Sequence, residues 1–114
     1  MLTIEKLRAY GADVDEGLAR CMGMEDFYIG LVVKALADNR LPLLERQIGE
    51  GDLDAAFETA HALKGMYANL SLTPLIKPVS EMTELLRARQ NVDYSPYLTE
   101  MKKQKTLLDE LCGA

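Results

Sequence analysis

The segment LDAAFETAHALKGMYANL, residues 53–70, constrains the fold of this 114-residue chain more than any other stretch. At about 100° per residue, its apolar positions fall on one stripe of a helix. The stripe comprises Leu53, Phe57, Ala60, Leu63, Tyr67 and Leu70. A long helix with one apolar face is stabilised mainly by packing that face against other elements. The segment therefore predicts a helix within a helical bundle.

The amino-terminal part of the chain shows further helix signals. Asp13 followed by Glu16 is typical of a capping box, in which Asp13 caps the helix and Glu16 reaches back, and a short helix should run to about Cys21. A second helix is predicted over residues 24–39, where apolar residues recur at helical spacing. Its predicted apolar face comprises Phe27, Leu31, Val32, Ala35 and Leu36.

The next helix is bounded by proline and glycine. Pro42 fits its first turn, and Gly49 and Gly51 should end it. Asp52 then stands where it can cap the helix that contains residues 53–70.

The last two helices share one start signal, a hydroxyl residue followed by proline at the first helical position. The pairs are Thr73 with Pro74 and Ser95 with Pro96. Pro78 lies one turn further on and removes a backbone hydrogen bond, so the helix toward residue 89 should start late or bend. Together the signals predict an all-α fold, an antiparallel four-helix bundle over about 25–112 with short extra helices over about 1–22, in one domain spanning 1–114.

Charge and hydropathy exclude several classes of partner. With 13 Lys and Arg against 18 Asp and Glu, the formal net charge is −5, which disfavours nucleic acid and anionic membranes. No stretch approaches the apolar length of a membrane span or a signal peptide. Cys21 and Cys112 lack the spacing of a paired motif and are predicted to be free thiols. We expect a soluble cytoplasmic protein.

His61 is the only histidine, and its position on the helix limits its role. It lies about 120° from the centre of the apolar stripe, which predicts an exposed side chain rather than a core residue. The two cysteines have no metal-motif spacing relative to it, so no metal site is expected. A hydrolase would need an orienting acid and an oxyanion hole, and no local residues supply them, although such groups can come from distant positions.

An exposed imidazole can accept a phosphoryl group, because a free imidazole is mostly neutral at neutral pH and its bare nitrogen is a good nucleophile. Lys64, one turn after His61, can offset the charge of that group. Gly65, at the next position, leaves room for a partner to approach.

These residues carry a family resemblance. AHALKG, followed by MYANL, is similar to the His-x-Leu-Lys-Gly signature of the histidine-containing phosphotransfer (HPt) domain. The flanking segments resemble the helices of that family in order, over about residues 25–112. Where the family often has glycine after NL, this chain has Ser71, and Met66 and Tyr67 replace small residues. These departures bear on helix packing and partner choice.

The resemblance implies a phosphorelay intermediate. His61 would accept a phosphoryl group from the aspartate of a receiver domain, or from a hybrid sensor histidine kinase, and pass it to a response regulator. Lys64 would stabilise the charge and Gly65 would give partner access. The family uses no cofactor of its own, since Mg²⁺ belongs to the receiver, and the chain has no ATP-binding loop, so no kinase activity of its own is expected. A monomer is expected.

Two other functions stay open. One is a non-catalytic helical adaptor that binds receiver domains, against which the intact signature argues. The other is a bundle enzyme or metal protein that uses His61 with distant partners, against which the single histidine argues. The lysines of segment 100–105 are interpreted as the solvated face of the last helix.

Overall fold

The computed structural model describes residues 1–113, and these residues form seven helices and no strand. The helices are α1 (Ile4–Tyr10), α2 (Val14–Arg20), α3 (Glu25–Leu36), α4 (Arg40–Gly49), α5 (Leu53–Asn69), α6 (Thr73–Arg87) and α7 (Ser95–Gly113). The predicted all-α class is confirmed.

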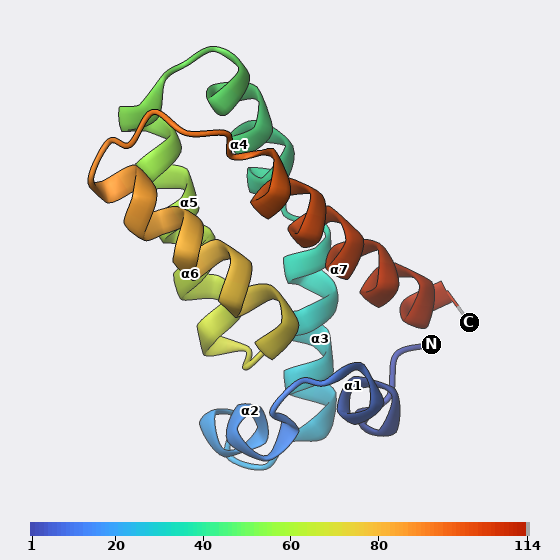
Figure 1. Cartoon of the computed structure of the whole chain (residues 1–114). Coiled ribbons are helices and arrows are strands. Elements are labelled where there is room, and N and C mark those ends of the chain that lie inside the picture. The colour runs from blue at the N-terminus through green and yellow to red at the C-terminus, as the bar shows by residue number, and fades with distance from the viewer. Residues whose placement is uncertain (114) are drawn as a thin grey trace.

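The long helices make a bundle in which α5 runs opposite to α4 and α6, and α7 runs opposite to α6 (Figure 1). α5 packs most extensively against α6, and the next largest contacts join α6 to α7 and α4 to α5. α3 and α4 follow one another along the remaining side, where α3 contacts α7. The short helices α1 and α2 lie at the end of the bundle where α3 begins.

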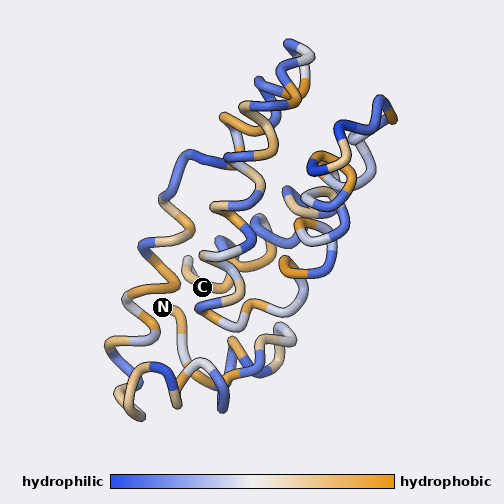
Figure 2. Tube along the Cα trace, turned by 90° about the vertical axis from the view of Figure 1, so that its left-hand side faces the viewer, coloured by the Kyte–Doolittle hydropathy of each residue, from blue (hydrophilic) through white to orange (hydrophobic). Residues whose placement is uncertain are grey.

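One apolar core joins all seven helices. Figure 2 shows hydrophobic and hydrophilic residues alternating along them, as expected when each helix buries one face. The largest fully buried side chains are Tyr28, Leu7, Leu44, Leu63, Leu72, Leu75, Met82, Leu86, Met101, Leu108, Val14 and Val32. Burial of this apolar surface is the main force that holds the bundle together.

The predicted aspartate caps are present. The carboxylate of Asp52 accepts a hydrogen bond of 3.1 Å from the backbone N–H of Ala55, and Asp13 accepts one of 3.2 Å from Glu16. Pro42 lies in the first turn of α4, and Gly51, with φ of +74°, follows that helix. Each cap satisfies a backbone donor that the helix itself leaves unpaired.

The hydroxyl caps predicted for α6 and α7 are wrong. Thr73 is the first residue of α6, and its hydroxyl donates to the carbonyl of Ser71 at 3.5 Å. Ser95 is likewise the first residue of α7, and its backbone N–H donates to the carboxylate of Asp93 at 2.9 Å. Pro78 does not delay α6, which already starts at Thr73 and contains the buried Pro78.

The predicted apolar face of α3 is wrong at Phe27, whose side chain is 52% exposed. The neighbouring Tyr28 is fully buried instead, together with the predicted Val32. The reason lies in α2, where Gly17 lets the Tyr28 ring approach so closely that a Cβ at position 17 would stand 2.6 Å from it. Tertiary contact therefore decides which face of α3 turns inward.

Two remaining sequence predictions concern cysteines and membranes. Cys21 and Cys112 are both free thiols, the first buried and the second half-buried. None of the helices formed by residues 1–113 is long and apolar enough to cross a membrane.

Candidate functional site

His61 lies in the middle of α5 with its side chain exposed, as the helical wheel predicts. The opposite side of α5 holds the predicted apolar stripe. Ala60, Leu63, Tyr67 and Leu70 are buried, whereas Leu53 and Phe57 are half-buried. Packing of the stripe fixes the rotation of α5 and thereby points His61 away from the core.

The imidazole of His61 has one direct neighbour of note, the ring of Phe57 one turn earlier on α5. The two ring centroids are 5.7 Å apart and the ring planes differ by 27°, a stacked arrangement. Within residues 1–113, no hydrogen bond reaches either ring nitrogen. The side chain is exposed, and neither ring nitrogen is occupied by a hydrogen bond from this part of the chain.

Lys64 lies one turn after His61 and is half-exposed. Its ammonium is 3.9 Å from a carboxylate oxygen of Glu84 on α6. The other oxygen of Glu84 is 3.3 Å from the guanidinium of Arg87. The structure therefore brings Lys64 to the face of His61 and pairs it loosely with an exposed acid, an interaction of at most about 1 kcal/mol.

Two arginines complete the surroundings of Phe57. The guanidinium carbons of Arg87 and Arg89 lie 5.0 and 5.1 Å from the centre of its ring, within the range of a cation–π interaction. Arg89 also donates to the carboxylate of Asp54 on α5 at 2.6 Å. Asp54 and Glu58 are both exposed.

Sequence reasoning missed Phe57, Arg87 and Arg89 as neighbours of the histidine. The i to i+4 spacing of Phe57 and His61 was an available signal, because such residues adjoin on a helix surface. Arg87 is the last residue of α6 and Arg89 follows it closely, and only the antiparallel packing of α5 on α6 brings them near.

Gly65 lies beside His61 on the exposed side of α5. A Cβ added at this position would meet no atom within 4 Å. Glycine within a helix costs about 1 kcal/mol relative to alanine. Because a side chain would fit at position 65, packing within the chain does not explain why glycine stands there.

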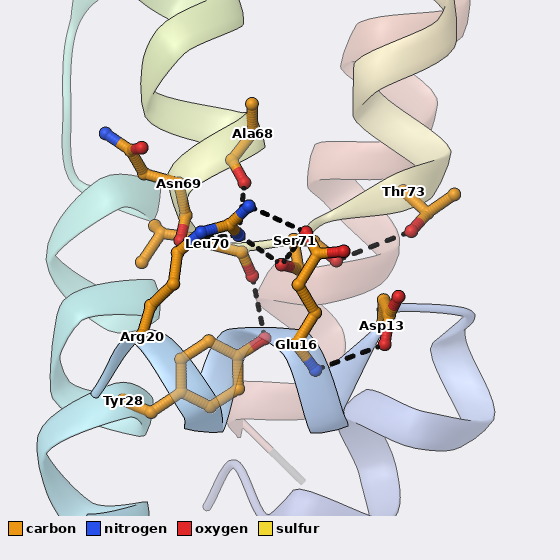
Figure 3. A network of polar contacts seen from close by, with 9 residues as sticks. All are labelled: Asp13, Glu16, Arg20, Tyr28, Ala68, Asn69, Leu70, Ser71 and Thr73. Atoms are coloured by element: carbon orange, nitrogen blue, oxygen red, sulfur yellow. Dashed lines mark hydrogen bonds and ion pairs between the residues drawn. The ribbon is translucent and has the colours of Figure 1, made fainter. Parts of the chain in front are cut away.

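The carboxyl end of α5 is built differently, around Ser71 (Figure 3). Ser71 has φ of +55°, in the left-handed region that glycine adopts most easily. Its buried hydroxyl donates to Glu16 at 3.0 Å and accepts from Arg20 at 2.7 Å. Glu16 therefore does not reach back to complete the predicted capping box.

Arg20 and Tyr28 bind the last carbonyl groups of this helix end. Arg20 donates to the carbonyl of Ala68 at 2.9 Å, and the Tyr28 hydroxyl donates to the carbonyl of Leu70 at 2.7 Å (Figure 3). Burial raises the pKa of Tyr28. The hydrogen bond from Ser71, followed by the contacts of Arg20, lowers the pKa of Glu16.

Other predicted features lie away from this constellation. Lys102 and Lys103 are exposed on α7, and Lys102 pairs with Glu45 of α4, in agreement with a solvated face. Met66 is half-buried against the core. Within residues 1–113, no three His, Cys, Asp or Glu residues cluster in a way that could hold a metal ion.

Fold and site together define a helical bundle that presents an exposed histidine from the middle of one helix, with a cation and a glycine beside it. A family model described as Hpt domain matches residues 32–114, and the chain belongs to this family. No curated protein and no solved structure gives a significant match. Membership implies histidine phosphotransfer in two-component signalling. The matched segment contains α4 to α7, whereas α1, α2 and most of α3 precede it.

Proposed function

We propose that this protein is a phosphorelay intermediate. His61 accepts a phosphoryl group from the aspartate of a receiver domain, which can belong to a hybrid sensor histidine kinase, and passes it to the receiver of a response regulator. The observation that carries the proposal is the exposed imidazole of His61, which makes no hydrogen bond within residues 1–113 and lies in the segment that matches the family.

In the proposed transfer, a ring nitrogen of neutral His61 attacks the phosphorus of the partner's aspartyl phosphate. The nitrogen–phosphorus bond forms while the phosphorus–oxygen bond to the carboxylate breaks. The electron pair of the broken bond stays on the carboxylate, and the proton on the other ring nitrogen remains there or passes to solvent. The reverse reaction delivers the phosphoryl group to the next receiver.

Lys64 and Gly65 take separate roles in this proposal. The ammonium of Lys64 offsets the negative charge that gathers on the transferring oxygens, and its weak pairing with Glu84 leaves it available. Gly65 keeps the surface beside His61 low, so that the phosphoaspartate can reach in-line distance. Open space at Gly65 within the chain supports this role.

The proposal makes the protein a carrier rather than a kinase. It binds no cofactor of its own, and the Mg²⁺ of the reaction is held by the receiver domain. We propose that it acts as a monomer in the cytoplasm, where one copy of His61 serves one docked receiver at a time. Sedimentation that shows a tight dimer would contradict the monomer.

A two-receiver relay tests the function. A receiver domain carrying labelled phosphoryl groups is incubated with the full chain, and the label on the chain should be acid-labile and alkali-stable. After the first receiver is removed, a second, unlabelled receiver should take the label from the chain. The second step distinguishes a relay intermediate from a protein that merely drains a receiver.

The variant His61→Gln is the control in the same relay. It should take up no label while it still binds the receivers. If the parent chain binds receivers but takes up no label, the protein is a helical adaptor and the phosphotransfer proposal is wrong.

A further inference from the structure

We infer that Phe57 is a positioning residue for phosphoryl transfer, and that its ring holds the imidazole of His61 in the orientation that reacts. The inference rests on the proposed function and adds to it a residue outside the His-x-Leu-Lys-Gly signature. The ring of Phe57 would act through His61, without touching the phosphoryl group.

The need for a positioning group follows from the exposure of His61. A side chain on a helix surface exchanges rotamers freely unless a contact restricts it. Within residues 1–113, no hydrogen bond fixes the imidazole. It stacks on the ring of Phe57, with the two ring centroids 5.7 Å apart. Reaction requires the attacking nitrogen in line with the phosphorus, so an unrestrained ring would react from a fraction of its orientations.

Phe57 can serve as a support because it is itself held. It is half-buried and packs against the apolar core. Arg87 and Arg89, from the end of α6, lie over its ring at 5.0 and 5.1 Å. Both guanidinium groups are anchored in turn, the first by Glu84 and the second by Asp54. Two helices therefore fix the ring on which His61 stacks.

Arg89, two residues after the end of α6, is held in place by its own contacts. Arg89 has φ of +52°, a backbone conformation that costs free energy for a residue with a side chain. Its guanidinium donates to the carbonyl of Leu86 at 2.7 Å and to Asp54 at 2.6 Å. These contacts hold the guanidinium at the Phe57 ring, next to the site.

The test compares Phe57→Leu, Phe57→Tyr and Phe27→Leu. Leucine keeps an apolar side chain at position 57 but removes the ring, whereas tyrosine keeps the ring. Phe27 is the matched control, because it is the other phenylalanine of the chain, is 52% exposed and lies in the first turn of α3. Circular dichroism checks that each variant keeps its helices.

Each variant is phosphorylated both by a phosphorylated receiver and by phosphoramidate. Phe57→Leu should slow both reactions about 3- to 10-fold, since a stacked aromatic pair stabilises one arrangement by about that factor. With the receiver, the loss should appear in kcat rather than KM. Phe57→Tyr and Phe27→Leu should react at nearly the parent rate.

Two outcomes would overturn the inference while leaving the proposed function intact. One is a Phe57→Leu variant that reacts at the parent rate with both donors. The other is a variant slowed with the receiver alone, which would make Phe57 a docking contact. If the parent chain takes a phosphoryl group from neither donor, the proposed function fails, and the inference fails with it.

A measurement on the parent chain alone protects the test against a variant that does not fold. His61 is the sole histidine, so its ring protons give unambiguous NMR signals. The ring current of Phe57 should displace these signals from the positions of free histidine. Signals at the free positions would mean that the rings do not stack, and would overturn the inference.

Discussion

The two parts of α5, its exposed middle and its carboxyl end, are stabilised in opposite ways. Around His61, the charged contacts are exposed ion pairs, such as Lys64 with Glu84 and Arg89 with Asp54. Around Ser71, the buried hydroxyl binds the half-exposed pair Glu16 and Arg20 of α2, and the buried phenol of Tyr28 on α3 binds the carbonyl of Leu70. Exposed pairs are weak and screened by salt, whereas buried hydrogen bonds are costly to break.

The difference separates the chemistry from the support. Lys64, whose ion pair with Glu84 is long at 3.9 Å, can exchange this partner for a phosphoryl group at little cost. The hydrogen bonds at Ser71 hold α5 in place while that exchange occurs. Variants in the exposed middle of α5 should therefore mainly affect activity, and variants at its carboxyl end should mainly affect stability.

The largest effect is expected from His61→Gln. It should abolish phosphoryl acceptance and change the free energy of unfolding by less than about 1 kcal/mol, because the side chain lies off the core. Phosphate incorporation and urea unfolding measure the two quantities. A much larger loss of stability would make His61 a structural residue.

Gly65→Leu should separate docking from chemistry. The new side chain would hold a receiver away from His61, and a displacement of about 1 Å can slow transfer about 100-fold. Phosphoramidate needs no protein surface and should modify His61 at nearly the parent rate. Transfer from the receiver at the parent rate would remove Gly65 from the docking surface.

Gly17→Ala, near the carboxyl end of α5, and Gly65→Ala, in its exposed middle, make the same change. They should shift the free energy of unfolding in opposite directions. A Cβ at Gly17 would stand 2.6 Å from the ring of Tyr28, whose hydroxyl is tied to Leu70, so the variant should lose about 1–3 kcal/mol. A Cβ at Gly65 meets open space and should add up to about 1 kcal/mol. Urea denaturation of both variants checks the contrast, which two equal changes would refute.

Lys64→Ala should slow transfer about 10-fold without abolishing it, because a half-exposed ammonium is partly screened by water and the nucleophile remains. Lys103→Ala, which removes an exposed charge from α7, is the control and should leave the rate unchanged. Single-turnover kinetics with a phosphorylated receiver gives both rates. Equal rates for parent and Lys64→Ala would exclude Lys64 from the mechanism.

The smallest effect is expected from Glu16→Gln, through pH. Because the folded state lowers the pKa of Glu16 below its ordinary 4.5, the stability from its carboxylate is complete above that value and is lost as the pH falls through the lower folded-state pKa. The variant should therefore be less stable than the parent at neutral pH and nearly equal to it in acid. An equal difference at both pH values would show that Glu16 contributes no such titration.

Local signals gave a reliable prediction where the interaction itself is local. Asp13 and Asp52 cap their helices because the acceptor and donor are three positions apart. The exposure of His61 follows from the apolar stripe on its own helix. The helices near Thr73 and Ser95 begin one residue earlier than predicted. At Ser95 the backbone N–H donates to Asp93, whereas no side chain caps the start of α6.

Predictions failed where distant segments decide the outcome. The choice of Tyr28 over Phe27 depends on the missing side chain at Gly17 and on the carbonyl of Leu70. Ser71 departs from the family pattern, which the sequence shows. That its hydroxyl binds α2 can be known only from the folded structure. Arg89 reaches Phe57 through the packing of α6 on α5, which the helical wheel of α5 does not contain.

NMR of the parent chain before and after treatment with phosphoramidate tests the central claim most directly. The account predicts a phosphorus NMR signal from a phosphoryl group bonded to a ring nitrogen of His61. It also predicts that the backbone signals of Lys64 and Gly65 shift. The backbone signals of Tyr28 and Ser71 should stay where they are. A phosphoryl group on another residue, or an unmodified His61, would contradict the account.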